Sequence, residues 1–242
     1  MKQFKFLATA CVAVSTLVLF FSCNDGGEKK ASETAVDTST AKPSAPAPAA
    51  KPGNVLIIMH KVANFAKWKL AYESHDSARV ANGLHNYIVS RGVADPNMVM
   101  VALKMDDANK AKEFTARPDL KTAMEKGGVI GTPSFNYIEV LMLDTSTNIQ
   151  TTRVILTHKV KDWDDWKKEF DSHKQVRMDA GLTDRAVGYS VGDNHSVTVV
   201  CAVNDMKKAE AFFKSPDLKE KMAKAGVEGP PAIFFYTVAQ MY

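Results

Sequence analysis

The distribution of apolar and polar positions divides the chain into three stretches. Residues 6–21 are almost entirely apolar, and residues 24–53 are polar, rich in Lys, Ser, Thr, Ala and Pro, and contain no aromatic side chain. From residue 54 to the C-terminus, short apolar runs alternate with stretches in which apolar residues recur every three or four positions. This mixture of strand-like and helix-like periods is typical of a folded α+β region.

The first half of the mixed region predicts a strand, a helix and two further strands. Val55–Met59 form a continuous apolar run, as in a central strand. Asn64 can cap the following helix, and Gly83 supplies its C-terminal stop. One face of that helix carries Phe65, Trp68, Tyr72, His75 and Arg79. Residues 86–91 and 98–105 predict two strands joined by a turn.

A second helical stretch and a last strand complete the unit. We expect Asp106 to cap this stretch, and Pro118 to interrupt it at a position where a first helical residue suits proline. Gly127 and Gly128 end it, and residues 134–142 predict the last strand. The order strand, helix, strand, strand, helix, strand is the ferredoxin-like βαββαβ unit.

The same unit occurs twice, because the sequence matches itself without a gap when it is shifted by 98 residues. His60, for example, corresponds to His158. The copies span residues 54–144 and 152–242. Two copies are too few for a solenoid, so a pseudo-twofold pair is the better interpretation. A lone four-stranded unit leaves one sheet face bare. We therefore predict that the two repeats close into one eight-stranded α/β barrel that buries both faces.

Four duplicated motifs carry a resemblance to a known family. They are His-Lys-Val-x-[Asn/Asp]-[Phe/Trp]-x-x-Trp-Lys, Ser-His-x-x-x-Arg-x-x-x-Gly-Leu, Pro-Asp-Leu and Gly-Val-x-Gly-x-Pro. Over residues 54–240 the chain resembles the dimeric α/β-barrel superfamily, which includes proteins like the antibiotic-biosynthesis monooxygenases. The resemblance implies that one chain supplies what those relatives build from two. Members range from cofactor-free monooxygenases and lactone isomerases to haem-degrading enzymes and proteins without known activity, so the fold alone does not select a function.

The apolar start predicts an export signal with a lipid anchor. Lys2 and Lys5 precede an apolar core shorter than the roughly 20 residues of a spanning helix, so residues 1–22 are interpreted as a signal peptide. Leu19–Cys23 resembles a bacterial lipobox, which implies cleavage before Cys23 and its lipidation. Residues 23–53 would then form a disordered tether. We expect a lipid-anchored protein of the cell envelope, at the outer membrane and facing the periplasm.

Charge and cysteine content narrow the partners. The formal net charge is +4, which becomes +2 once Lys2 and Lys5 leave with the signal peptide. No run of Lys and Arg is long enough for a nucleic-acid footprint, so nucleic acid is not an expected partner. Loss of Cys11 and lipidation of Cys23 would leave Cys201 as the single thiol, in a strand-like run where it acts as a small buried apolar residue. Pairing of the repeats within one chain is compatible with a monomer.

The candidate ligand-binding residues are the duplicated polar and aromatic positions. His75 lies seven residues after Trp68 and four before Arg79, so the three share one helix face. With His60 they could hold an anionic or enolic substrate, Arg supplying charge and His a base with a pKa near neutrality. The other interpretation is that they are hydrogen-bonded residues that lock helix to strand. The complete set is His60, Trp68, His75, Arg79, His158, Trp166, His173 and Arg177; no residue is assigned as catalytic.

Cofactors receive little support from the sequence. Two histidines per copy without a cysteine ligand are too few for a catalytic metal site. The family resemblance leaves room for haem bound through His75 or His173, although no haem attachment motif occurs. Two functions stay open: a membrane-tethered module that binds a small ligand or is purely structural, and a cofactor-independent monooxygenase or isomerase acting on a small enolic or aromatic substrate. A pocket between helices and sheet would distinguish a ligand site from a solid scaffold.

Overall fold

Strands and helices alternate along the chain in the predicted order, and the order occurs twice. The computed structural model describes residues 52–146 and 150–242, which belong to a unit spanning Pro48–Tyr242. The predicted signal peptide, Cys23 and most of the predicted tether lie outside the described residues. The first repeat consists of β1 (Asn54–Val62), α1 (Phe65–Ser74), α2 (Asp76–Val80), β2 (Leu84–Gly92), β3 (Met98–Met105), α3 (Ala108–Thr115), α4 (Pro118–Lys126) and β4 (Val129–Leu143).

The second repeat has the same succession of elements. It consists of β5 (Thr152–Val160), α5 (Trp163–Ser172), α6 (Lys174–Asp179), β6 (Leu182–Ser190), β7 (Asp193–Val203), α7 (Met206–Phe213), α8 (Pro216–Lys224) and β8 (Val227–Met241). In the part of the chain that the structure describes, no helix is long and apolar enough to span a membrane.

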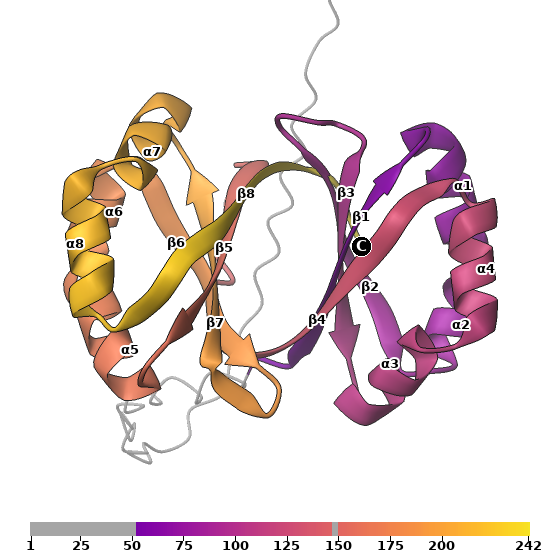
Figure 1. Cartoon of the computed structure of the whole chain (residues 1–242). Helices are drawn as coiled ribbons and strands as arrows, with labels where there is room; N and C mark the ends of the chain where they lie inside the picture. The colour runs from indigo at the N-terminus through magenta and orange to yellow at the C-terminus, as the bar shows by residue number, and fades with distance from the viewer. Residues whose placement is uncertain (1–51, 147–149) are drawn as a thin grey trace, which may run out of the picture. The chain divides into compact units, whose positions relative to one another are not determined.

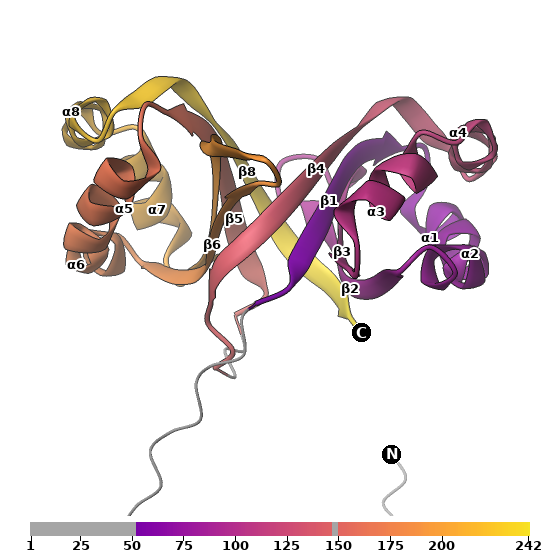
Figure 2. The same cartoon turned by 90° about the horizontal axis from the view of Figure 1, so that it is seen from below.

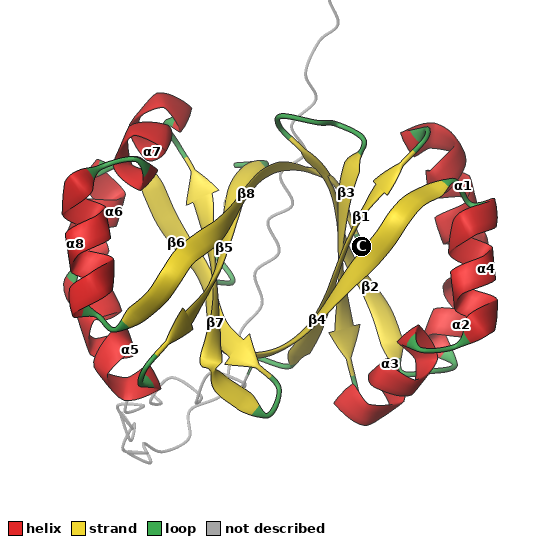
Figure 3. Cartoon of the chain, in the orientation of Figure 1, coloured by secondary structure: helices red, strands yellow, loops and turns green. Residues whose placement is uncertain are grey.

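The strands form one closed antiparallel barrel, which confirms the predicted fold class. Their order is β1-β3-β2-β8-β5-β7-β6-β4, and β4 pairs back onto β1. The repeats meet at two seams, where β4 pairs with β6 and β8 pairs with β2. Helices α1–α4 cover one flank of the barrel and α5–α8 cover the opposite flank (Figures 1 and 2). Figure 3 shows the resulting helix–sheet–sheet–helix layering.

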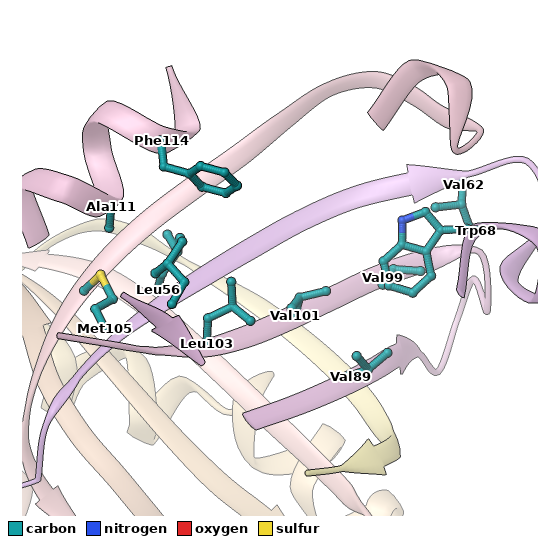
Figure 4. Close-up of a cluster of buried hydrophobic side chains, with 11 residues drawn as sticks. Leu56, Val62, Trp68, Val89, Val99, Val101, Leu103, Met105, Ala111 and Phe114 are labelled. Atoms are coloured by element: carbon teal, nitrogen blue, oxygen red, sulfur yellow. The ribbon is translucent and has the colours of Figure 1, made fainter. Parts of the chain in front are cut away.

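Alternation along each strand sorts side chains between two kinds of core. On β1, Leu56 faces the helices and belongs to the cluster drawn in Figure 4, which also holds Trp68 and Phe114. The neighbouring Ile57 belongs to a different cluster, together with Ile155 and Tyr236 of the other repeat. Successive strand residues point to opposite faces of a sheet. The sheet face that one repeat would leave bare is therefore buried against its twin.

Local capping explains where the helices begin and end. The Asn64 side chain accepts a hydrogen bond from the Lys67 amide at 3.0 Å, as predicted. The second helical stretch begins one residue later than expected, because Asp107, not Asp106, accepts from the Lys110 amide. Asp106 is still held by the sheet, its amide donating to the carbonyl of Gly83 at 2.9 Å. Its side chain pairs with His85 instead.

Candidate functional site

Each repeat encloses a cavity between its helices and the helix-facing side of its sheet. The first-repeat cavity has a volume of about 70 Å³ and the second-repeat cavity about 80 Å³. All eight candidate residues line them: His60, Trp68, His75 and Arg79 in the first, and His158, Trp166, His173 and Arg177 in the second. The remaining lining is mainly apolar, so a pocket lies between helices and sheet in both repeats.

His60 and His158 lie deep in these cavities without a hydrogen-bond partner. Only 4% of His60 and 6% of His158 is exposed, and no hydrogen-bond partner among residues 52–146 and 150–242 reaches a ring nitrogen of either residue. Burial lowers the pKa of each imidazole from 6.5 to about 4, so both rings are neutral at neutral pH. A neutral imidazole offers one N–H donor and one acceptor nitrogen. Each cavity therefore contains one unused donor and one unused acceptor.

Stacked aromatic rings form the wall beside each histidine. The Trp68 ring lies 5.3 Å from His60 and 5.1 Å from Tyr72, centroid to centroid. In the second repeat, Trp166 lies 5.5 Å from His158 and 5.0 Å from Phe170. The helical spacing of the aromatic residues on α1 and α5 produces these stacks, since residues four apart lie on one face. The wall is flat and apolar, and is suited to an apolar molecule.

Arg177 is buried, and each of its three guanidinium nitrogens already donates a hydrogen bond. Its Nε and Nη2 donate to the two carboxylate oxygens of Asp184 at 2.7 and 2.6 Å, and Nη1 donates to the Phe170 carbonyl at 2.6 Å. The guanidinium also lies 3.6 Å above the Phe170 ring. A bidentate pair of this kind leaves little charge for a ligand. The contacts of Arg177 tie α6 to β6.

Arg79 makes the corresponding contacts with a different acid. It donates to the Tyr72 carbonyl at 2.7 Å, to Asn86 at 3.1 Å and to Asp76 at 3.2 Å. Its guanidinium lies 3.8 Å from the Tyr72 ring centroid. Both arginines thus border the cavities while acting as ties between helix and strand. To pair with Arg79 or Arg177, an anionic ligand would have to displace the carboxylate of Asp76 or Asp184.

His75 and His173 stand at the cavity mouths, where α1 meets α2 and α5 meets α6. Each residue ends one helix and precedes the next, with φ near −96°. His75 is exposed and its Nδ1 lies 2.9 Å from the Ala71 carbonyl oxygen, whereas His173 is half-buried. The structure therefore brings the four duplicated residue types to one cavity per repeat, with one histidine deep inside and the other at the rim.

Several lining residues were not singled out from the sequence. The helices α4 and α8 contribute Leu120 with Met124 and Leu218 with Met222. The spacing of four between the members of each pair is the signal that could have found them. Cys201 is buried, as predicted, but it lines the second-repeat cavity, and desolvation raises the pKa of its thiol.

The site does not offer what a metal or haem group needs. Within residues 52–146 and 150–242, no three His, Cys, Asp or Glu side chains gather to hold a metal ion. Cavities of 70 and 80 Å³ are far below the roughly 300–1,000 Å³ of typical cofactor pockets. Haem is larger than either cavity, so neither cavity encloses it with the helices and sheet placed as they are.

Comparison with known proteins identifies the fold. No family model matches the chain, and no curated protein matches it. Among solved structures, a Fusobacterium nucleatum protein provisionally assigned as a monooxygenase is 13% identical with a TM-score of 0.51, over 78% of this chain and 93% of its own. The chain has the ferredoxin-like fold of the dimeric α/β-barrel proteins.

Two other structures agree with this assignment. An anthrone oxidase-like protein is 13% identical with a TM-score of 0.51, over 78% of this chain and 92% of its own. A protein provisionally assigned as a chlorite dismutase is 13% identical with a TM-score of 0.50, over 78% and 96% of the two chains. At such identities the likeness extends to the barrel fold and not to the chemistry.

Proposed function

We propose that each repeat binds a small, mostly apolar molecule that carries no negative charge and at least one hydrogen-bonding group. The observation that supports this proposal is the pair of buried, unpartnered imidazoles of His60 and His158. A buried polar group without a partner costs about 1–3 kcal/mol, and native interiors rarely leave one unsatisfied. A ligand hydroxyl or carbonyl inside the cavity would satisfy the ring nitrogens.

Size and charge define the ligand class further. The cavities, at about 70 and 80 Å³, have roughly half the volume of a 150 Å³ cavity that binds benzene. A single small ring with its far end at the mouth matches this volume. Because Arg79, Arg177 and Lys221 already pair with carboxylates, no lining cation in the described part of the chain is left to compensate an anion.

The alternative is a cofactor-independent monooxygenase or isomerase, which the assignments of two structural neighbours favour. Such chemistry requires a base, and the best base has a pKa near the working pH. His60 and His158, with pKa values of about 4, are weak bases at neutral pH. The two buried imidazoles therefore favour binding over proton abstraction deep in the cavities.

We also propose that the binding domain is held in the cell envelope by lipid on Cys23, with residues 24–53 as the tether. This part of the proposal rests on the sequence alone. It is tested by fractionating cells that express the native chain and a Cys23→Ser variant in the presence of radiolabelled palmitate. Labelled protein in the outer-membrane fraction supports the anchor; equal distribution of the two proteins contradicts it.

The binding proposal is tested by titrating the full-length protein with phenol in a calorimeter. We expect two sites per chain. His60→Leu and His158→Leu should each weaken one site about tenfold, because one hydrogen bond is lost. His85→Leu is the matched control, since His85 lies on the surface and pairs with Asp106. Absence of phenol binding, or unchanged binding in the double variant, would overturn the proposal.

A further inference from the structure

We propose that the two cavities differ in ligand range: the second-repeat cavity accepts small aromatic amines as well as their uncharged relatives, and the first-repeat cavity takes only the uncharged relatives. This inference rests on the proposed binding function and goes beyond it by assigning a ligand class to each repeat. It is carried by two substitutions at the cavity mouths, where the repeats otherwise match closely.

The inner parts of the two cavities are nearly the same. His60 and Trp68 correspond to His158 and Trp166 with similar ring distances, 5.3 and 5.5 Å. Both cavities therefore present the same neutral imidazole beside the same indole. A difference in ligand preference between the two cavities therefore has to come from other lining residues.

The mouth of the second-repeat cavity carries charge. Glu169 of α5 and Lys221 of α8 both line it and both are half-buried. The Lys221 ammonium already pairs with Asp217 at 2.9 Å. Among the described residues, no ion pair or side-chain hydrogen bond engages the Glu169 carboxylate. The mouth thus holds one carboxylate whose charge is not compensated by a direct contact, which favours a cationic group there.

Apart from His75, the mouth of the first-repeat cavity is apolar and tight. Ala71 and Ala123 stand at the positions of Glu169 and Lys221. Gly127, at the end of α4, packs so closely that a Cβ on it would lie 3.3 Å from the Ala71 Cβ and 3.2 Å from the Ala123 carbonyl oxygen. An ammonium group at this mouth would lose water without gaining a partner, which is costly.

The second-repeat cavity also has the more aromatic lining. Phe212 and Phe213 both line it, and Phe213 packs edge-on against Phe235 at 5.8 Å. In the first repeat Phe114 takes the place of Phe212 and also lines the cavity, but Thr115 and Tyr137 take the places of Phe213 and Phe235, and their hydroxyls bond to each other at 2.5 Å. An aromatic body with its hydroxyl at His158 and its ammonium at Glu169 matches this arrangement.

The probes that test the inference are tyramine and 4-ethylphenol, which differ only by the terminal amine. We expect full-length protein at pH 7 to bind 4-ethylphenol at two sites and tyramine at one. Glu169→Gln should weaken tyramine about fivefold and leave 4-ethylphenol unchanged, since only the ion pair is removed. A second tyramine site should appear in Ala71→Glu or in Ala123→Glu, which place a carboxylate on opposite sides of the first-repeat mouth; failure of both variants would contradict the inference.

The outcomes separate the two proposals. Binding of 4-ethylphenol reports on the cavities themselves, so its absence at both sites overturns the proposed function and this inference with it. Tyramine binding at two equal sites, or tyramine binding that is indifferent to Glu169→Gln, overturns the inference while the proposed function stands. Loss of 4-ethylphenol binding in Glu169→Gln would likewise contradict it, because the carboxylate would then serve the cavity's structure.

Discussion

The ring nitrogens of His60 and His158 are buried, and no described residue forms a hydrogen bond with them. Active sites and binding sites commonly hold such costly groups, because function and stability compete there. In the ligand-free protein, His60→Leu and His158→Leu should each raise the free energy of unfolding by about 1 kcal/mol, since the unsatisfied nitrogens disappear. Urea denaturation at pH 7 measures this. A clear loss of stability would instead assign the rings to the scaffold.

The same two residues predict a pH dependence of stability. Their pKa is about 4 in the folded protein and 6.5 when unfolded, so between these values the unfolded chain binds protons that the folded chain does not. The free energy of unfolding should therefore fall as the pH drops from 6.5 to 4, by roughly up to 3 kcal/mol per histidine, and stay level above pH 7. Urea midpoints across pH 4–8 test this.

The matched comparison for the pH series is the His60→Leu/His158→Leu double variant. Carboxylates such as Asp95, whose pKa is lowered by Lys61, contribute in both proteins and cancel in the difference. The double variant should lose most of the slope between pH 6.5 and 4. Parallel curves for the two proteins would mean that the imidazoles do not resist protonation.

At the residue scale, the sequence identified which side chains share a cavity but not what each one does there. The helical spacing of Trp68, His75 and Arg79 was enough to place them together. The partners of Arg79 were not predictable, because Asn86 lies on β2 and only the folded chain brings it within reach. The same holds for His60, whose lack of a partner is a property of the packed surroundings.

At the element scale, the two repeats keep an acid beside the buried arginine by different means. In the first repeat the acid is Asp76 on α2, facing Asn86 on β2. In the second repeat the helix position holds Lys174 and the strand position holds Asp184. One carboxylate per arginine is thus retained although its element changes. This pairing explains how the copies diverged without losing the tie between helix and strand.

That exchange can be reproduced within the first repeat. Asp76→Lys alone should lower the free energy of unfolding by about 1–2 kcal/mol, less than for a fully buried pair because half of the Asp76 side chain is exposed. Adding Asn86→Asp should recover most of the loss, since Arg79 regains a carboxylate. A double-mutant cycle measures the coupling. Strictly additive effects would show that the two positions act independently.

Caps and stops were the elements' most predictable features because they depend on neighbours in sequence. Asn64 caps α1, and Gly83 ends the helical stretch with φ of +68°, a left-handed conformation that suits glycine. The assignment of the cap to Asp106 was wrong for a non-local reason. The amide of Asp106 is held by Gly83, which is 23 positions away in sequence.

At the scale of the whole molecule, the closed barrel was predictable, because a single repeat would leave one face of its sheet uncovered. The strand pairs that join the two repeats were not predictable. The last strand was predicted over residues 134–142, whereas β4 and β8 are each 15 residues long. β4 begins in its own repeat, on β1, and ends in the other, on β6. Such a crossing depends on which edges meet after both repeats fold, and no local pattern encodes it.

The seam between β4 and β6 should be the most sensitive to added volume. Gly188 of β6 faces Val140 of β4, and a Cβ on it would overlap the carbonyl oxygen of Glu139. The backbone of Glu139 cannot move away from this Cβ unless β4 and β6 separate. We expect Gly188→Ala to lower the free energy of unfolding by about 3 kcal/mol or more, at the upper end of what overpacking costs.

The pseudo-twofold gives this prediction its own control. The position equivalent to Gly188 is Ser90, which lies at the β2–β8 seam, is fully buried and has an unpartnered hydroxyl. Because Ser90 already carries a Cβ, Ser90→Ala should leave stability unchanged or raise it slightly. Thermal unfolding compares the two variants, and size-exclusion chromatography reports whether an opened Gly188→Ala seam exposes interior strands to another copy. Equal stability of the Gly188→Ala and Ser90→Ala variants would contradict the prediction. It would mean that β4 and β6 can separate enough at Gly188 to accept a Cβ.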